Sequence, residues 1–313
     1  MRAGTAPRIG IVGAGGIAPP HIEGWLALGV EVSILNRTGA DALAVRYGTR
    51  IHETLDELLD ASEIVDIVSP TPTHLEISRA AFARGRHVVC EKPLAVMASD
   101  AQAMADAAHA AGVRLFPAHV VRYFDGYHRL HEQRETVGRM LELTLRRTVA
   151  APSAAWFYSQ ELGGGIIRDL MIHDLDQALW LAGPVVEVSA TQDPSAVEEQ
   201  PPISAHVTLT HANGAISHVR ADWFEPDTPF RSQAQVVGAG GTLHFDTDEL
   251  GGVREGYLPP ASDLDPYQAQ LADFLDAIRT GRDARVTPED GVAAVALVDA
   301  AYASLASGHP VVL

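Results

Sequence analysis

A carboxylate and an imidazole stand four residues apart in the segment LGGGIIRDLMIHDLDQALWLAG, residues 162–183. The segment has the apolar spacing of a buried amphipathic helix, so Asp169 and His173 would lie on one face and reach one shared point. Imidazole exchanges protons near neutral pH, which suits a general acid or base. The three glycines before the helix, residues 163–165, would let the chain pass close to a ligand. A purely structural Asp–His pair is the alternative.

A lysine in an apolar setting is the second chemical feature. The run HVVCEKPLA predicts a strand that ends at Glu91, Lys92 and Pro93. The carboxyl end of a parallel strand is where open α/β sheets bind ligands, and a proline there stiffens the turn. Glu91 can hold the ammonium or a cofactor hydroxyl, and we expect a cis Lys92–Pro93 bond. A surface lysine in a loop is the alternative.

The glycine-rich segment GAGGIA follows a strand-like run near the N-terminus and precedes a helical pattern. Gly13 permits a tight turn, Gly15 lets a pyrophosphate approach the backbone, and the small Ala18 lets the helix pack on the strand. We therefore expect a dinucleotide site, with a plain glycine-rich turn as the alternative. The expected cofactor contacts in this loop are Gly13, Gly15, Gly16 and Ile17.

The end of the second predicted strand indicates which dinucleotide binds. An acidic residue there would bind the ribose diol of NAD and repel the extra phosphate of NADP. The sequence has Asn36, Arg37 and Thr38 instead. A neutral amide removes the repulsion, and a guanidinium beside a hydroxyl suits a 2′-phosphate. These three residues therefore favour NADP(H) over NAD(H), and a solvated loop arginine is the alternative.

The elements that must position these residues form two patterns. Up to about Pro117, β-branched runs alternate with helical patterns, which is typical of βαβ units in a doubly wound parallel sheet. Beyond it, alternating runs and an Asn213–Gly214 hairpin signal predict a large, mainly antiparallel open sheet with helices. We expect an α/β N-terminal Rossmann domain over residues 1–118 and a C-terminal α+β domain over residues 119–313.

Composition excludes several classes of partner. The 23 basic and 40 acidic residues give a net charge of −17, which repels nucleic acid and anionic membrane surfaces. No segment has the pattern of a signal peptide or a membrane span. Cys90 is the only cysteine, which fits a reducing, cytoplasmic location. No metal is expected, because the following histidines lack the spacing of ligands: His21, His52, His87, His128 and His131.

Four motifs together resemble the Gfo/Idh/MocA family of NAD(P)-dependent sugar and polyol oxidoreductases. They are GAGGIA, SPTPTH at residues 69–74, CEKP and GGGIIRDLMIHDLD, and the resemblance extends over nearly the whole chain. It implies a Rossmann domain followed by a largely antiparallel domain. It also implies that the open sheet of the second domain forms oligomer contacts, which predicts a homodimer or homotetramer.

The resemblance implies roles for three residues around the nicotinamide. His173 matches the family's general acid or base, and Asp169 matches a carboxylate that hydrogen-bonds the substrate. Lys92 matches a lysine that orients the substrate hydroxyl and favours developing negative charge. These residues would manage the proton while hydride moves between the cofactor and a carbon atom.

Further assignments concern residues outside this set. The resemblance makes Thr71 and Pro72 cofactor contacts, and the carboxylate chemistry of Glu91 makes it a further expected cofactor contact. Arg122 falls where relatives carry an Asn-Arg pair that contacts substrate, but the asparagine is missing here, and a structural ion pair is the alternative. Tyr267 could border a sugar pocket, as could Trp156, although aromatic packing is the default interpretation.

The expected function is that of a sugar or inositol dehydrogenase. It would transfer hydride between a nicotinamide and a hydroxyl or keto carbon of a sugar, cyclitol or related polyol. Two alternatives stay open. Some relatives use bound NAD for transient oxidation during glycoside cleavage, and others are non-catalytic regulators that sense nucleotides or sugars.

Overall fold

The chain divides into two compact units in a computed structural model that describes residues 6–35, 37–159, 162–194, 201–247 and 265–313. Unit 1 comprises Met1–Tyr123 and Leu264–Val292, and unit 2 comprises Phe124–Asp263 and Ala293–Leu313. The first segment of unit 1 ends close to the boundary expected at residue 118. The second segment lies within the range expected for the C-terminal domain, and its packing on unit 1 explains the difference.

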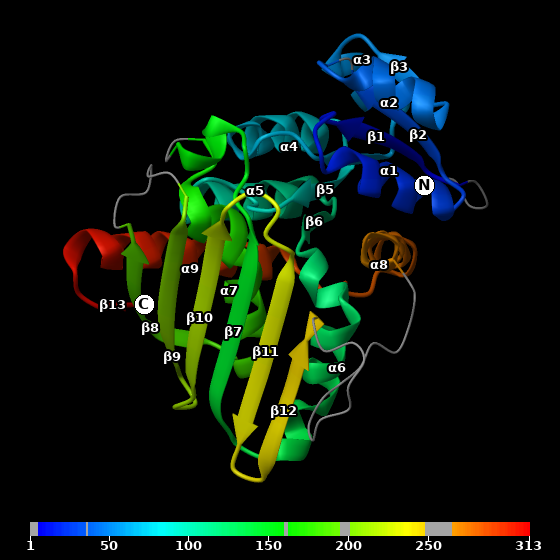
Figure 1. Ribbon diagram of the computed structural model, residues 1–313. Coiled ribbons are helices and arrows are strands. Elements are labelled where there is room, and N and C mark those ends of the chain that lie inside the picture. The colour runs from blue at the N-terminus through cyan, green and yellow to red at the C-terminus, as the bar shows by residue number, and fades with distance from the viewer. Residues whose placement is uncertain (1–5, 36, 160–161, 195–200, 248–264) are drawn as a thin grey trace. The chain divides into compact units, whose positions relative to one another are not determined.

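Unit 1 is built on a six-stranded parallel sheet in the order β3-β2-β1-β4-β5-β6 (Figure 1). The order reverses between β1 and β4, which is the switch point where open α/β sheets bind ligands. The strands are β1 (Arg8–Val12), β2 (Glu31–Leu35), β3 (Arg50–His52), β4 (Ile64–Ile67), β5 (His87–Glu91) and β6 (Leu115–Ala118). The helices are α1 (Ala18–Ala27), α2 (Ala40–Tyr47), α3 (Leu55–Ala61), α4 (His74–Ala83), α5 (Ala98–Ala111) and α8 (Pro266–Thr280). This confirms the predicted Rossmann fold, to which the structure adds the short edge strand β3.

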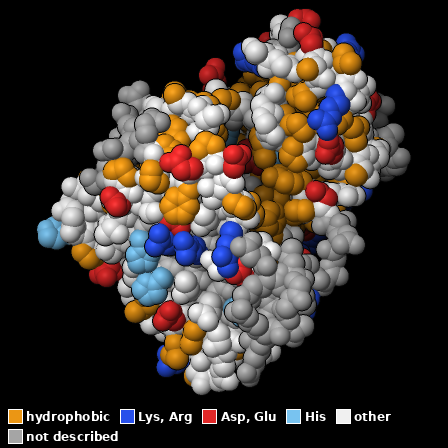
Figure 2. Space-filling model, in the orientation of Figure 1, with side chains coloured by type: hydrophobic (Ala, Val, Ile, Leu, Met, Phe, Trp, Pro, Cys, Tyr) orange, Lys and Arg blue, Asp and Glu red, His pale blue; other side chains and the backbone are white. Residues whose placement is uncertain are grey.

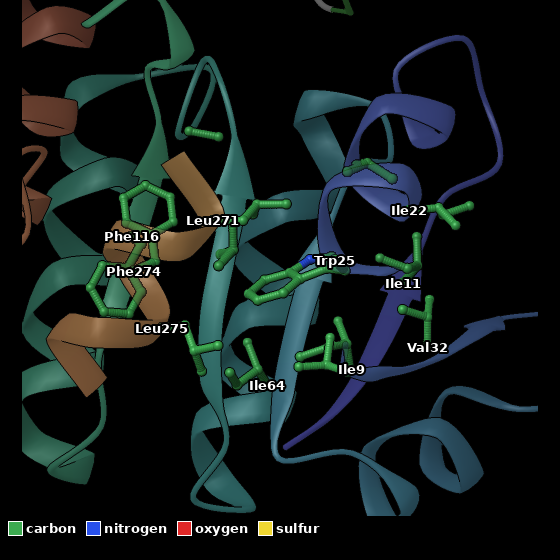
Figure 3. Packing of buried hydrophobic residues seen from close by; sticks show 14 of the residues in the cluster. Ile9, Ile11, Ile22, Trp25, Val32, Ile64, Phe116, Leu271, Phe274 and Leu275 are labelled. Atoms are coloured by element: carbon green, nitrogen blue, oxygen red, sulfur yellow. The ribbon is translucent and has the colours of Figure 1, made fainter. Parts of the chain in front are cut away.

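Successive side chains of β1 point to opposite faces of this sheet, and helices pack on both faces. Ile9 and Ile11 point to one face, where they pack in a cluster with residues of α1 and α8 (Figure 3). Gly10 points to the other face, where a Cβ atom would lie 2.5 Å from a methyl carbon of Leu58 on α3. The glycine therefore allows α3 to pack closely on the strand.

Helix α8 explains why the second segment belongs to unit 1. Its apolar face contributes Leu271, Phe274 and Leu275 to the cluster that contains Trp25 of α1 (Figure 3). The ring of Phe274 stacks on Phe116 of β6 with 4.8 Å between centroids. The sequence periodicity predicts an amphipathic helix here but does not show which of two sheets it covers, because both offer apolar surfaces.

Unit 2 is built on a seven-stranded sheet in the order β12-β11-β7-β10-β9-β8-β13. All neighbouring pairs are antiparallel except β7 and β10, which run parallel. The strands are β7 (Met140–Ala150), β8 (Val185–Asp193), β9 (Ile203–His211), β10 (Ile216–Phe224), β11 (Arg231–Gly238), β12 (Gly241–Asp246) and β13 (Val311–Val312). The mainly antiparallel sheet is confirmed, and Gly214, with a φ of 84°, forms the predicted turn between β9 and β10.

Helices α6 (Asp125–Gln133) and α7 (Ile172–Ala182) contact the sheet of unit 2. Side chains of arginine and histidine gather on the opposite face of the sheet (Figure 2). There Asp222 of β10 forms ion pairs with Arg146 at 3.2 Å and Arg220 at 2.9 Å. Because the sheet exposes this polar face, its strands alternate between apolar and polar residues.

Helix α9 (Pro288–Ser307) is the last helix of the chain. Thr287 caps its start, because the Thr287 hydroxyl accepts a hydrogen bond from the backbone N–H of Asp290 at 3.3 Å. Among the described residues, α9 alone is long and apolar enough to cross a membrane, and half of its apolar window is buried within the protein. The same properties are found in core helices of globular proteins.

Candidate functional site

The glycine loop of unit 1 leaves one side of its backbone open. Gly13 has a φ of +126°, and a Cβ atom there would lie 2.6 Å from the backbone of Val68, so the position requires glycine. In contrast, nothing lies within 4 Å of a Cβ atom built on Gly15 or Gly16. The first turn of α1, which follows Ile17, carries no acidic residue. The open loop therefore fits a pyrophosphate at a helix N-terminus.

The loop after β2 lies beside the glycine loop. A Cβ atom on Gly39 would lie 3.2 Å from the carbonyl oxygen of Ala14. Arg37 and Thr38 are exposed in this loop, and within the described residues no ion pair engages the Arg37 side chain. Asn36 falls outside the described residues. The guanidinium is thus available beside the expected adenosine end of a dinucleotide.

The segment after β4 forms a short 3₁₀ turn, Thr71–Thr73, at the same edge of the sheet. Thr71 is buried and Pro72 is exposed. One ring nitrogen of the buried His74 lies 2.8 Å from the Ser69 carbonyl oxygen, and the other lies 3.0 Å from that of Pro93. His74 therefore joins the turn after β4 to the corner after β5, which is a structural role.

Lys92 directly follows the last residue of β5 and is half-buried. The Lys92–Pro93 bond is cis, as expected. Because β1, β4 and β5 are parallel, Lys92 lies on the sheet edge that also carries the glycine loop. Lys92 is also the only lysine among the 313 residues. At every other position counted as lysine or arginine the chain has arginine. The presence of a single lysine is a feature of the composition that singles out this residue, and motif spacing does not reveal it.

Three buried ionisable side chains lie behind this corner. His21 of α1 and Asp66 of β4 are fully buried, and Glu91 is 6% exposed. The Nδ1 atom of His21 lies 2.8 Å from Asp66 Oδ2, and its Nε2 atom lies 3.0 Å from Glu91 Oε1. Trp25 Nε1 donates a second hydrogen bond to Asp66 at 2.7 Å. We call His21, Asp66 and Glu91 the buried triad.

The charge state of the buried triad follows from its partners. Burial alone would lower the pKa of His21, but the charge and hydrogen bond of Asp66, together with those of Glu91, outweigh it and raise the pKa to about 10. Both ring nitrogens then donate. Burial would likewise raise the pKa of Glu91, but the hydrogen bond and charge of His21 lower it. The triad therefore holds an imidazolium between two carboxylates.

Stability should depend on pH through the buried triad. The pKa of His21 rises from 6.5 to about 10 on folding, so its contribution is complete below pH 6.5 and is lost as pH rises through 10. Between pH 6.5 and pH 10 we expect the Tm of the wild type to fall. The fall should be about 5 °C larger than that of the double variant His21→Leu/Asp66→Asn. Tyr267, whose ring lies 5.6 Å from His21, has a pKa raised by burial and titrates above this window. Thermal unfolding at constant ionic strength measures both slopes, and equal slopes would contradict the prediction.

In unit 2, a π-helical turn, Ile167–Met171, precedes α7 where the sequence predicts a continuous α-helix. The hydrophobic spacing cannot reveal this insertion of a wider turn, and such turns occur often at functional sites. Every residue from 163 to 178 is buried except Asp169 and His173, which are half-buried. The apolar segment therefore has one accessible polar corner, made of these two residues.

The three glycines before this turn have a different role from the one expected. A Cβ atom on Gly163 would lie 2.5 Å from the Cα atom of Phe157, and Gly164 has a φ of +77°. The close approach is thus to the chain itself. Tyr302 of α9 donates a hydrogen bond to the Gly164 carbonyl, and its hydroxyl accepts one from the Arg168 backbone N–H at 3.4 Å. These contacts fix the start of the segment that carries Asp169.

The residue after His173 anchors α7 to the sheet. Asp174 is fully buried and accepts two hydrogen bonds from Arg147 of β7, at 2.9 and 2.8 Å. Asp176 is buried as well. Both aspartates therefore belong to the packing of α7 rather than to its accessible corner. The buried ion pair fixes the rotation of α7 and hence the direction of His173.

Three further expected residues each have contacts within their own unit. Arg122 is 2% exposed and pairs with Asp290 at 3.0 Å within unit 1, which is the structural alternative to substrate contact. Tyr267 of α8 is half-buried near His21, and the negative charge of Glu91 adds to burial in raising its pKa. Trp156 of unit 2 stacks on Phe157 with 3.8 Å between centroids. Tyr267 thus lies close to His21 and Glu91 in its own unit.

The described residues contain no group of three or more His, Cys, Asp or Glu side chains that could hold a metal ion.

The buried triad was not predicted, because its members lie 45 and 70 positions apart in the sequence. Each of them alone resembles an ordinary residue of a helix or strand.

Comparison with known proteins agrees with this architecture. Residues 7–119 match the description "Oxidoreductase family, NAD-binding Rossmann fold", and residues 132–244 match "GFO/IDH/MocA C-terminal domain". The inositol 2-dehydrogenase of Cereibacter sphaeroides is 30% identical, over 93% of this chain and 92% of that protein. The UDP-N-acetylglucosamine 3-dehydrogenase of Acidithiobacillus ferrooxidans is 29% identical, over 88% of this chain and 90% of that protein.

A solved structure shows the same fold over the whole chain. GenD2 from gentamicin A biosynthesis, solved in complex with NAD, superimposes with a TM-score of 0.86 and is 28% identical, over 98% of this chain and 96% of that one. The Rossmann sheet, the mainly antiparallel second sheet and the similarity along nearly the entire sequence all agree. The chain therefore belongs to the GFO/IDH/MocA family of oxidoreductases with an NAD-binding Rossmann fold.

Proposed function

We propose that this oxidoreductase transfers hydride between a nicotinamide dinucleotide and a hydroxyl or keto carbon of a sugar, cyclitol or related polyol. The observation that carries the proposal is the single polar corner of an otherwise buried segment, formed by Asp169 and His173. Dehydrogenation of an alcohol needs a group that accepts the hydroxyl proton, and a half-buried imidazole is suited to this task. Relatives named as inositol and sugar-nucleotide dehydrogenases support the substrate class.

The proposed roles follow from the chemistry of each side chain. His173 takes the proton from the substrate hydroxyl during oxidation and returns it during reduction. Lys92 orients the same hydroxyl through its ammonium and stabilises the negative charge that develops on the oxygen. Asp169 accepts a hydrogen bond from a neighbouring substrate hydroxyl, and Tyr267 borders the substrate. When bound, the nicotinamide ring accepts or supplies the hydride.

The cofactor would lie along the carboxyl edge of the parallel sheet. The open backbone of the glycine loop, with Gly15 and Gly16, fits the pyrophosphate. Thr71 and Pro72 lie at the same edge, where they would contact the nicotinamide half. Glu91 would act there indirectly, because its carboxylate binds the Lys92 backbone N–H and His21.

We favour NADP(H) because Arg37 is exposed beside the glycine loop and is not engaged by another described side chain. Replacing Arg37 by alanine should lower kcat/KM with NADP about tenfold or more, since the 2′-phosphate loses a charged hydrogen-bond donor. With NAD, kcat/KM should change much less. Steady-state kinetics with both cofactors checks this, and a wild-type preference for NAD, the cofactor in the GenD2 structure, would overturn the assignment.

The direct test mixes the protein with NADP or NAD and a panel of inositols, aldoses and sugar nucleotides. The expected result is a substrate-dependent rise in nicotinamide absorbance, abolished in the variant His173→Asn. Cleavage of a glycoside without net change in absorbance would instead support transient oxidation. Ligand binding without either reaction would support a sensing protein.

Two further proposals concern the state of the protein. The polar face of the unit 2 sheet, where Arg146 and Arg220 pair with the buried Asp222, would form contacts between copies in a homodimer or homotetramer. Light scattering checks this, and a monomer would contradict it. A cytoplasmic location is supported by the single cysteine, Cys90, which is buried. The net charge of −17 disfavours nucleic acid and membrane partners.

A further inference from the structure

The buried triad has a direct connection to Lys92. Glu91 binds His21 with Oε1 at 3.0 Å and accepts the backbone N–H of Lys92 with Oε2 at 2.9 Å. The Glu91 carboxylate thus joins the His21 imidazolium of α1 to the backbone of Lys92. His74 holds the next residue from another direction, because a ring nitrogen lies 3.0 Å from the Pro93 carbonyl oxygen. The Lys92 corner is therefore held by buried polar groups on both sides.

Packing of α1 on the sheet does not require these charges. The same helix already contributes Ile22 and Trp25 to the apolar cluster. Replacement of a buried ion pair by apolar residues of similar size is often neutral or stabilising, because desolvation offsets much of the charge attraction. The charges of the buried triad therefore add little to the free energy of unfolding compared with apolar residues of similar size. The value of the triad lies in geometry, since charge-assisted hydrogen bonds are short and directional.

We infer that His21 is a positioning residue for Lys92, acting through Glu91. The imidazolium fixes one oxygen of the Glu91 carboxylate, which leaves the other oxygen aimed at the Lys92 backbone N–H. This fixes the point from which the Lys92 side chain starts. The inference rests on the role proposed above for Lys92. Residues that orient another functional side chain, such as the partners of metal-ligating histidines, change activity about tenfold to a hundredfold when they are removed.

The single lysine of the chain permits a test that does not depend on turnover. An amine-selective reagent such as trinitrobenzenesulfonate labels only Lys92 and the terminal α-amino group, which peptide mass spectrometry separates. The matched variants are Asp66→Asn and Asp66→Asn/His21→Leu. The first keeps the bond from His21 to Glu91, and the second removes it together with the buried cation, so the net buried charge is the same as in the wild type.

In the double variant, Lys92 should be labelled about tenfold faster and kcat should fall about tenfold, with little change in KM for the cofactor. Asp66→Asn should stay close to the wild type in both measurements. Equal labelling rates and equal kcat in the two variants would overturn the inference. Should Lys92→Met itself retain full turnover, the proposed function would fail instead, while the labelling result would still decide whether His21 positions the lysine.

A second pair of variants covers the case in which the double variant does not fold. Glu91→Gln keeps an oxygen for the Lys92 N–H, and its amide N–H can donate to Nε2 of a neutral His21, whereas Glu91→Ala removes both contacts. Labelling of Lys92 should be about tenfold faster in Glu91→Ala than in Glu91→Gln. The same rate in both variants would show that the carboxylate does not hold the corner.

Discussion

Lys92→Met is expected to lower kcat about a hundredfold to a thousandfold, because the substituted side chain keeps a similar length but loses the ammonium. The charge that develops on the substrate oxygen then lacks its stabilising partner. No other lysine can substitute, since Lys92 is the only one in the chain. Stopped-flow or steady-state absorbance of the nicotinamide band measures the effect.

Lys92→Arg is the matched control for this prediction. It keeps the positive charge, but the planar guanidinium places its donors differently from an ammonium, so we expect an intermediate loss. Cofactor binding, followed by nicotinamide fluorescence, should change little in either variant because the glycine loop is untouched. A Lys92→Met enzyme with kcat within about threefold of the wild type would exclude a catalytic role.

His173→Asn is expected to lower kcat about a hundredfold or more, because the amide cannot exchange a proton near neutral pH. The limb of the pH–rate profile that belongs to an imidazole should disappear at the same time. Asp169→Asn, on the same polar corner, should act more on substrate KM than on kcat, since Asp169 is proposed to bind rather than to transfer a proton. Profiles of kcat and kcat/KM against pH measure both effects.

His309→Asn makes the same chemical change at an exposed imidazole of unit 2 and should leave the profile unchanged. Folding of each variant can be checked by thermal unfolding. The buried ion pair with Arg147 belongs to the neighbouring Asp174, so His173→Asn leaves that anchor of α7 intact. A pH profile that is identical in the wild type and in His173→Asn would contradict the assignment.

The sequence predicted unit 1 well, because each of its longer strands is a compact β-branched run followed by glycine, proline or a helix signal. The strands β1, β2, β4, β5 and β6 all lie where these runs predict. The short strand β3 was not predicted, since three residues with one apolar side chain do not form a recognisable pattern. The glycine loop and Lys92 were found for the same reason, because both directly follow strands.

In unit 2 the sequence predicted the strands and α7 but not their detailed geometry. The parallel pairing of β7 with β10 joins segments about 75 residues apart, and alternation within a strand is the same for either direction. The π-helical turn before α7 leaves no trace in the apolar spacing. The glycines 163–165 were expected to let the chain approach a ligand, whereas a Cβ atom on Gly163 would meet the backbone of Phe157.

The sequence by itself determined the two kinds of sheet, and it predicts the phosphate loop and the site residues Lys92, Asp169 and His173, because each corresponds to a local pattern of spacing and residue type. The tertiary structure alone decided that α8 packs on unit 1 and that His21, Asp66 and Glu91 meet behind Lys92. Local patterns record which face of an element is apolar or polar. They do not record which distant face it will contact, because that choice depends on the packing of the whole chain.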